Sequence, residues 1–397
     1  MIKLDVNSEI FTRSVEDIIT REELKKLLSE GRRLRVKHGI DATSPELHLG
    51  HAANLWKLRA LQEAGHKAVI LLGDTTTRIG DPTGKNKARP ELSATIIKKN
   101  IKAIQRQAER ILLGGPGLLE IRRSSEWYEK MSAPQFLKLL SYVTHARLIE
   151  RDMFQARVKK GGEIFMHELI YPILQGYDSV MLKSDLTVIG SDQLFNEHMG
   201  RFLQEKFGQK PQVIVTLKIL PGLEGGDKMS KSLGNYIGLS DTSQDKFGKT
   251  MRIPDVLIVS YLTAYTNVAF SKIKEIESKL RAGKNPMEAK LFLAEAIVKR
   301  YHGVAVAKIE RERFLNIFSK HELPEEPPIK KVTQGPWQPI ELLLKLGLAP
   351  SKSAARRLLA QGAVKVGGQS IRNVGEKIKV HSGTVVQIGN RKFVKIR

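Results

Sequence analysis

Apolar and polar positions along the chain follow two rhythms, and their order predicts an α/β protein. From Arg35 to Ile40 the two kinds alternate as in a strand, and from Leu47 to Gly65 apolar residues recur at helical spacing. A continuous apolar run, Ala68–Gly73, follows, which is typical of a buried parallel strand. Strand, helix, strand predicts the start of a Rossmann-like, doubly wound parallel sheet, whose ligands bind beyond the carboxyl ends of the strands.

The same patterns predict further elements on both sides of this unit. One amphipathic helix is expected from Ser14 to Gly31, with Thr20 and Glu23 as a candidate capping box for its second half. The other predicted helices are Glu91–Gly114, Trp127–His145 and Glu163–Asp178, and the other strands are Leu118–Arg122, Asp185–Ile189 and Val213–Ile219. The amphipathic helix after Trp127 is a candidate dimer surface.

The last third of the chain changes character twice. The pattern is helical from Asp241 to Phe318, and the stretch His321–Pro336 is rich in proline and charge, which predicts a linker. Beyond it, Ser351 is expected to cap a short helix with cations on its outer face, followed by short β segments. The outward cations are Lys352, Arg356 and Arg357. A basic α+β unit of this size indicates an RNA-binding module.

Composition narrows the function classes. The 397 residues carry a net charge of +24, which predicts attraction to a polyanion such as nucleic acid or an acidic membrane. We find no apolar run long enough to cross a bilayer and no secretory signal, so nucleic acid and a cytoplasmic location are favoured, although a merely basic protein remains an alternative. The absence of cysteine excludes disulfides and thiolate metal sites.

Two loops carry candidate phosphate chemistry. His48-Leu49-Gly50-His51 begins the first helix of the sheet, where unpaired amides and the helix dipole favour an anion, and Gly50 leaves room for a flat ligand. The alternative is a helix that happens to begin with histidines. Asp74–Pro90 follows the second strand and includes Asp81 and several cations, although a solvated basic loop would look the same.

Three other groups of residues indicate a polar ligand. Tyr171, Gln175 and Asp178 fall on one face of an apolar helix, where they form either a ligand pocket or a structural hydrogen-bond network. Gly190-Ser191-Asp192-Gln193 follows a strand and suits a ribose or an amino group. In Gly225–Asn235, two lysines three residues apart can converge on one anion, unless the loop is only basic.

Together, the HLGH and KMSKS sequences resemble the signatures of class I aminoacyl-tRNA synthetases. IGDPTGK, YPILQGYD and GSDQ are similar to bacterial tyrosyl-tRNA synthetases, and the tail is similar to their S4-type RNA-binding domain. The resemblance covers nearly the whole chain. It implies ATP-dependent activation of tyrosine, with Mg²⁺ accompanying ATP and no dedicated metal site, then transfer to tRNA(Tyr) by a homodimer. It also implies a catalytic domain at 1–235, a helical tRNA-contacting domain at 236–325, a linker at 326–336 and the RNA-binding domain at 337–397.

The resemblance implies roles for individual residues. Tyr171, Gln175 and Asp81 would hold the substrate ammonium, Asp178 would accept the phenol hydroxyl, and Thr76 would line that pocket. Asp41, Gly50, Gly190, Asp192, Gln193 and Ser230 would bind ATP and the aminoacyl group, with Asp192 on the ribose. Thr43, His48 and His51 would contact the phosphates, while Lys85, Arg89, Lys228 and Lys231 would neutralise the pyrophosphate.

One position departs from the commonest pattern of the family. Many tyrosyl enzymes have a tyrosine four residues before Asp41, where it contacts the phenol oxygen, and this chain has Lys37. A second branch of the family carries lysine there, so the second phenol contact stays open. Three other functions also stay open: a tryptophanyl synthetase, a non-catalytic RNA-binding protein on a synthetase scaffold, and an unrelated nucleotide-binding protein.

Overall fold

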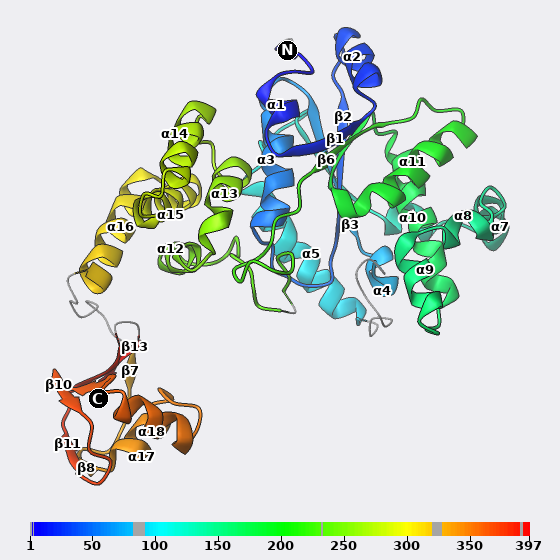
Figure 1. The fold of residues 1–397 in the computed structure, drawn as a ribbon. Coiled ribbons are helices and arrows are strands. Elements are labelled where there is room, and N and C mark those ends of the chain that lie inside the picture. Colours follow the sequence, from blue (N-terminus) through cyan, green and yellow to red (C-terminus); the bar gives the residue numbers. More distant parts are fainter. Residues whose placement is uncertain (1, 3, 82–91, 232, 320–327, 390–391) are drawn as a thin grey trace. The chain divides into compact units, whose positions relative to one another are not determined.

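The computed structural model describes residues 2, 4–81, 92–231, 233–319, 328–389 and 392–397 (Figure 1). These form two compact units, Met1–Tyr301 and His302–Arg397, which are described separately below.

A six-stranded sheet is the centre of the first unit, and Figure 1 shows helices around it. Its order is β1 (Val15–Ile19), β6 (Val213–Leu217), β5 (Leu186–Gly190), β2 (Arg35–Asp41), β3 (Lys67–Gly73) and β4 (Leu119–Arg123). All neighbours are parallel except the edge strand β1, which runs antiparallel to β6. The predicted doubly wound parallel sheet is confirmed.

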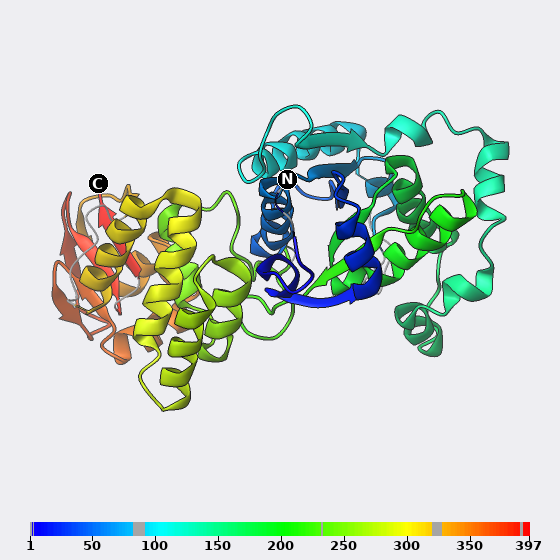
Figure 2. The same cartoon turned by 90° about the horizontal axis from the view of Figure 1, so that it is seen from above.

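Helices cover both faces of this sheet, as Figures 1 and 2 show. One face packs against α3 (Leu49–Glu63) and α5 (Ala94–Glu109), and the other lies towards α10 (Met166–Leu182) and α11 (Leu194–Lys206). Side chains of β3 divide between two cores: Ala68, Ile70 and Leu72 join the α3 side, while Val69 and Leu71 join the α10 side. A strand buried on both faces explains why this segment is a continuous apolar run.

The helix predicted from Ser14 to Gly31 is half wrong. Its first part is the strand β1, and only α2 (Arg21–Ser29) is helical, with the predicted capping box at Thr20 and Glu23. The first part contains Val15, Ile18 and Ile19, whose β-branched side chains fit a strand, and pairing with β6 satisfies its backbone.

The single helix predicted from Trp127 to His145 is also wrong. The segment forms α6 (Ser125–Tyr128), α7 (Ala133–Leu140) and α8 (His145–Ile149), followed by α9 (Asp152–Lys159). Ser132 and Thr144 each cap a new helix, so the amphipathic pattern runs across two breaks.

The helices after the sheet belong to the first unit. α12 (Ser243–Met251), α13 (Ile258–Tyr265), α14 (Phe270–Arg281) and α15 (Met287–His302) follow β6, and α13 to α15 share a core with Leu49 of α3. The short elements of this unit are α1 (Glu9–Thr12), α4 (Thr76–Ile79), and the 3₁₀ turns η1 (Ser191–Gln193) and η2 (Asp255–Leu257). The functional domain boundaries predicted above stay a prediction.

The second unit contains α16 (Val304–Ser319), α17 (Pro339–Lys345), α18 (Lys352–Ala360) and two small sheets. One sheet has the order β10 (Gln369–Ile371), β9 (Val364–Val366), β12 (Val385–Ile388), β13 (Lys392–Ile396) and β7 (Ile329–Lys330), and the other pairs β11 (Ile378–Val380) with β8 (Gly335–Trp337). β7 and β8 lie in the stretch predicted as linker, so its second half is structured. Ser351 caps α18 as predicted, through a 3.2 Å bond from the amide of Ala354.

Candidate active site

A cavity of about 740 Å³ opens at the carboxyl ends of β2, β3 and β5. The predicted site residues that border it are Asp41, Thr43, His48, Gly50, His51, Thr76, Asp81, Tyr171, Gln175, Asp178, Gly190, Asp192, Gln193, Lys228, Ser230 and Lys231. The predicted Lys85 and Arg89 lie outside the described residues. The fold thus gathers residues from five separate segments at one place, while their individual roles stay predictions.

The two histidines cap α3 reciprocally. His48 is the N-cap, and its Nδ1 accepts a 3.2 Å hydrogen bond from the amide of Gly50, while Nδ1 of His51 accepts a 3.3 Å bond from the amide of His48. Burial, with Lys231 and Lys228 nearby, lowers the pKa of His48 to about 3, and burial also lowers the pKa of His51 well below its usual value. Both rings are therefore neutral near pH 7, and each carries its proton on Nε2, as a donor.

Asp41, at the end of β2, joins the strand end to α4 and α10. Its Oδ2 accepts a 2.9 Å bond from the Tyr171 hydroxyl, and its Oδ1 accepts a 2.7 Å bond from Oγ1 of Thr76. A Cβ at Gly73 would lie 2.3 Å from Thr76 Oγ1 and 2.4 Å from Asp41 Oδ1, so this close approach requires glycine.

Asp178 is the most deeply buried carboxyl of the predicted site. It is 2% exposed, and its Oδ1 accepts a 3.0 Å hydrogen bond from Nε1 of Trp127. Burial raises the pKa of Asp178 to about 8, although the positive charge of Lys37 works in the opposite direction. A ligand hydroxyl that donates to this buried carboxyl would favour its ionised form and complete its hydrogen bonding.

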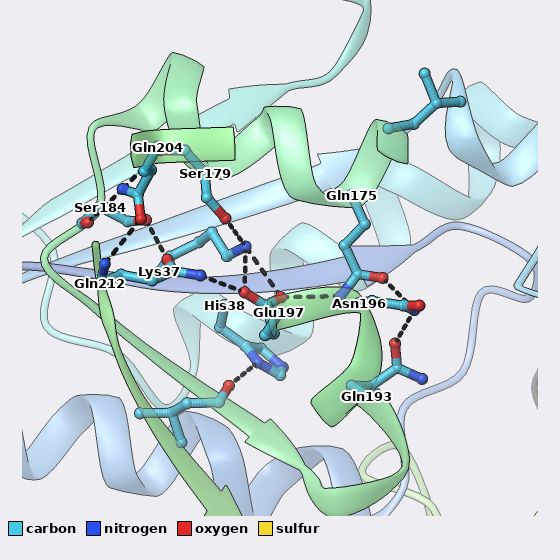
Figure 3. Close-up of polar contacts among 12 residues, drawn as sticks. Lys37, His38, Gln175, Ser179, Ser184, Gln193, Asn196, Glu197, Gln204 and Gln212 are labelled. Atoms are coloured by element: carbon cyan, nitrogen blue, oxygen red, sulfur yellow. Dashed lines mark hydrogen bonds and ion pairs between the residues drawn. The ribbon is translucent and has the colours of Figure 1, made fainter. Parts of the chain in front are cut away.

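Lys37 is held inside the protein and borders the cavity. Its Nζ lies 2.6 Å from Oγ of Ser179 and 2.8 and 3.0 Å from the two carboxylate oxygens of Glu197, and the lysine side chain is 1% exposed (Figure 3). Sequence reasoning singled out Lys37 but missed its partner. Glu197 follows Gln193 by four residues, so a shared helix face was visible, but no sequence pattern pairs it with a lysine 160 positions earlier.

Amide side chains continue this network towards Asp81. Gln175 donates from Nε2 to Glu197 at 2.8 Å, and Nδ2 of Asn196 donates to the carbonyl oxygens of Gln175 and Gln193 at 2.9 and 3.0 Å (Figure 3). Gln193 in turn donates from Nε2 to Asp81 at 2.6 Å.

Like Glu197 and Asn196, two further residues near this network were missed by sequence reasoning. One is Trp127, which donates to Asp178, and the other is the buried Arg151, whose Nη2 lies 3.7 Å from Oδ1 of Asp81. A buried arginine in a cationic chain gives no sequence signal that separates it from surface arginines.

The lysine loop is tied to the first histidine. Lys228 pairs with Asp192 at 2.5 Å, and the amide of Ser230 donates to Oδ1 of Asn235 at 2.8 Å. Just beyond the loop, the backbone pairs with the start of α3: the amide of Leu49 donates to Ile237 at 3.0 Å, and the carbonyl of Leu47 accepts from Leu239 at 2.7 Å. The segment that follows the KMSKS motif is therefore joined to the HLGH motif through main-chain hydrogen bonds.

The second unit carries the predicted RNA-binding cations. Lys352, Arg356 and Arg357 are exposed on α18, while Ala355 and Leu359 of the same helix are buried. Across the described residues of both units, no group of three or more histidine, cysteine or acidic side chains could hold a metal ion. In the same part of the chain, no helix is long and apolar enough to cross a membrane.

Comparison with known families decides the assignment. The model of tRNA synthetases class I (W and Y) matches residues 29–319, and the S4 domain model matches residues 341–385. The chain belongs to the class I tRNA synthetases of this W and Y family. This synthetase is 41% identical to a tyrosine–tRNA ligase of Thermotoga maritima, over 98% of this chain and 96% of the relative. It is 43% identical to a tyrosine–tRNA ligase of Carboxydothermus hydrogenoformans, over 98% of this chain and 97% of that relative.

Solved structures support the fold of this synthetase. Tyrosyl-tRNA synthetase of Archaeoglobus fulgidus, complexed with L-tyrosine, superposes with a TM-score of 0.62 at 23% identity, covering 77% of this chain and 100% of that one. A C-terminally truncated mitochondrial tyrosyl-tRNA synthetase of Aspergillus nidulans superposes with a TM-score of 0.64 at 22% identity, covering 79% of this chain and 94% of that one. These likenesses confirm the architecture, and the family matches above carry the assignment.

Proposed function

We propose that this synthetase is a tyrosine–tRNA ligase. It activates tyrosine with ATP to form tyrosyl-adenylate and pyrophosphate, and then transfers the tyrosyl group to the 3′ end of tRNA(Tyr). The observation that carries the proposal is the polar face of α10, where Tyr171, Gln175 and Asp178 border one cavity in a chain whose full-length relatives are tyrosine–tRNA ligases.

The amino acid is positioned by that face. In our proposal, Asp178 accepts the hydrogen bond of the phenol hydroxyl, deep in the pocket beside Trp127. Tyr171, Gln175 and Asp81 surround the ammonium group, and Thr76 packs beside them. This orientation leaves the tyrosine carboxylate facing the strand ends, where Asp41, Gly50, Gly190, Asp192, Gln193 and Ser230 contact ATP and the aminoacyl group, with Asp192 on the ribose.

The chemical step is in-line attack of the tyrosine carboxylate on the α-phosphorus of ATP, with pyrophosphate as the leaving group. No side chain needs to become covalently attached, because positioning and charge stabilisation drive phosphoryl-type transfers. His48 and His51 supply neutral Nε2–H donors to the phosphates together with Thr43, as their capping geometry supports. Lys228 and Lys231, with Lys85 and Arg89, would balance the charge that develops on pyrophosphate.

Three partners complete the proposal. Mg²⁺ enters as part of the Mg·ATP substrate, since magnesium is commonly held by substrate phosphates with few protein ligands. The exposed cations on α18 would contact tRNA phosphates. We further propose a homodimer acting in the cytoplasm, and exposed apolar side chains such as Leu137 and Met166, 64% and 71% exposed, support a protein contact at α7 and α10.

A single assay tests the activity. ATP–pyrophosphate exchange, measured with each of the twenty amino acids in turn, should depend on tyrosine alone. Exchange that depends on tryptophan instead would show that this synthetase is specific for tryptophan, the other amino acid of the W and Y family. No exchange with any amino acid would refute enzymatic activation and favour a role in RNA binding only.

A further inference from the structure

Glu197 of α11 is a buried carboxylate that lies between Lys37 and Gln175 and contacts both (Figure 3). It is 2% exposed, borders the cavity, and has no part in the roles proposed above. Donors reach it from three sides. Lys37 contacts both carboxylate oxygens, Gln175 donates to Oε1 at 2.8 Å, and Gln212 donates to Oε2 at 2.6 Å.

We propose that Glu197 is a positioning residue that orients the groups by which the pocket binds tyrosine. It acts through Gln175 on the ammonium end and through Lys37 on the phenol end. This inference rests on the proposed tyrosine–tRNA ligase function, and it adds a residue that touches neither substrate.

At the ammonium end, Glu197 fixes which way the amides face. An ionised carboxylate only accepts hydrogen bonds, so Gln175 must turn its Nε2 to Glu197 and its carbonyl oxygen away. Asn196 then donates to that oxygen and to the carbonyl oxygen of Gln193, which turns Nε2 of Gln193 towards Asp81. Each carbonyl oxygen keeps a second lone pair, so a substrate ammonium meets acceptors rather than donors.

At the phenol end, Glu197 keeps Lys37 from contacting the phenol directly, so that Lys37 acts only through its positive charge. The three protons of the Lys37 ammonium face Ser179 and the two oxygens of Glu197, so none is left for a phenol oxygen in this arrangement. Its positive charge instead favours the ionised form of Asp178, against the effect of burial. The position that departs from the commoner tyrosine pattern therefore acts on the phenol through Asp178.

The first test is Glu197→Gln, which keeps the shape but places an N–H where a donor already points. We expect the KM for tyrosine in pyrophosphate exchange to rise about tenfold or more, while the KM for ATP and kcat at saturating tyrosine change by about twofold at most. A matched control is Glu168→Gln in α10. Glu168 is 3% exposed and pairs with Arg157 at 2.9 Å away from the cavity, so its loss should lower stability without this selective rise in the tyrosine KM.

A double variant keeps the inference testable where the single variant fails to fold. Lys37→Met with Glu197→Leu removes both charges, and replacing a buried pair by apolar side chains tends to preserve the fold. Because Asp178 loses its positive neighbour, the preference for tyrosine over phenylalanine should fall about tenfold or more.

The outcomes distinguish a failure of the proposed role of Glu197 from a failure of the proposed ligase function. A wild-type protein without tyrosine-dependent exchange would overturn the ligase proposal itself. A normal wild-type protein, with an unchanged tyrosine KM in Glu197→Gln and unchanged selectivity in the double variant, would overturn only the role of Glu197. Equal effects of Glu197→Gln and Glu168→Gln on every parameter would likewise reduce Glu197 to a structural role.

Discussion

Replacing Asp178 by asparagine should weaken the enzyme and stabilise the protein at the same time. The Asp178 carboxyl is the proposed acceptor of the phenol hydroxyl, and a hydroxyl that donates to it favours its ionised form over the protonated form that burial favours in the free enzyme. Hydrogen bonds to charged groups are worth about 1.5–3 kcal/mol. Since about 1.4 kcal/mol corresponds to a factor of ten, kcat/KM for tyrosine should fall by about 10-fold to 150-fold. The rate with phenylalanine, which has no hydroxyl to lose, should stay close to the wild-type value.

Stability should change in the opposite direction. The pKa of Asp178 is raised from 3.8 to about 8, so the folded protein binds the proton more tightly than the unfolded chain does. Stability attributable to this group is therefore present below pH 3.8 and is lost as the pH rises through about 8. At pH 7 the cost of this carboxyl is on the order of 4 kcal/mol, and a neutral amide avoids that cost, which sets an upper limit on the gain.

The assays are pyrophosphate exchange with tyrosine and phenylalanine, and urea denaturation at pH 7. Asp74→Asn is a suitable control, because Asp74 accepts hydrogen bonds from Ser124 and Ser125 and does not border the cavity. An Asp178→Asn enzyme with the wild-type ratio of tyrosine to phenylalanine activity would refute the assigned role. A less stable Asp178→Asn protein would refute the claim that burial of this carboxyl opposes folding.

Three further predictions concern other parts of the chain. Lys231→Ala should slow adenylate formation by about 100-fold to 1000-fold with little change in tyrosine affinity, and a wild-type rate in stopped-flow measurements would contradict its role. A chain ending at residue 319 should form adenylate but lose tRNA charging, so full charging by this truncated chain would refute the division of labour. Because the pKa of His48 is lowered from 6.5 to about 3, the unfolded chain binds more protons between these values, and stability should fall as the pH drops below 6.5. His48→Gln should flatten that dependence in denaturation measured from about pH 5 to 7, and an unchanged slope would contradict the assignment.

Much of the fold follows from local sequence patterns, and the two failures have different causes. The strands β3, β5 and β6 were predictable because burial on both faces leaves continuous apolar runs, and β2 was predictable because polar and apolar residues alternate along it. The segment before Thr20 and the segment after Trp127 were mispredicted as helical. In the first, tertiary pairing with β6 outweighs local pattern, and in the second, capping residues break a continuous amphipathic rhythm.

The site was predictable where its residues stand in short motifs or on one helix face. The histidines, the lysine loop and the Tyr171, Gln175, Asp178 face all border the cavity, although the role of each stays a prediction. Glu197 and Trp127 could not be found, because each gains its meaning from a partner more than 50 positions away. Buried polar networks are assembled by the fold, and a linear pattern does not encode which donor meets which acceptor.

The main-chain pairing between Leu47, Leu49 and the segment after the lysine loop has a kinetic consequence. Ile237 and Leu239 are hydrogen-bonded to the residues at the start of α3. Only a few residues therefore separate Lys231 from a segment that is held beside the histidines. Each residue spans at most about 3.6 Å, so the Lys231 ammonium group stays near the histidines, and its local concentration at the proposed position of the ATP phosphates is on the order of millimolar or higher. In the proposed mechanism Lys231 therefore reaches ATP by a search within a small volume. Inserting glycines between Lys231 and Ile237 should slow adenylate formation while leaving every contact residue in place.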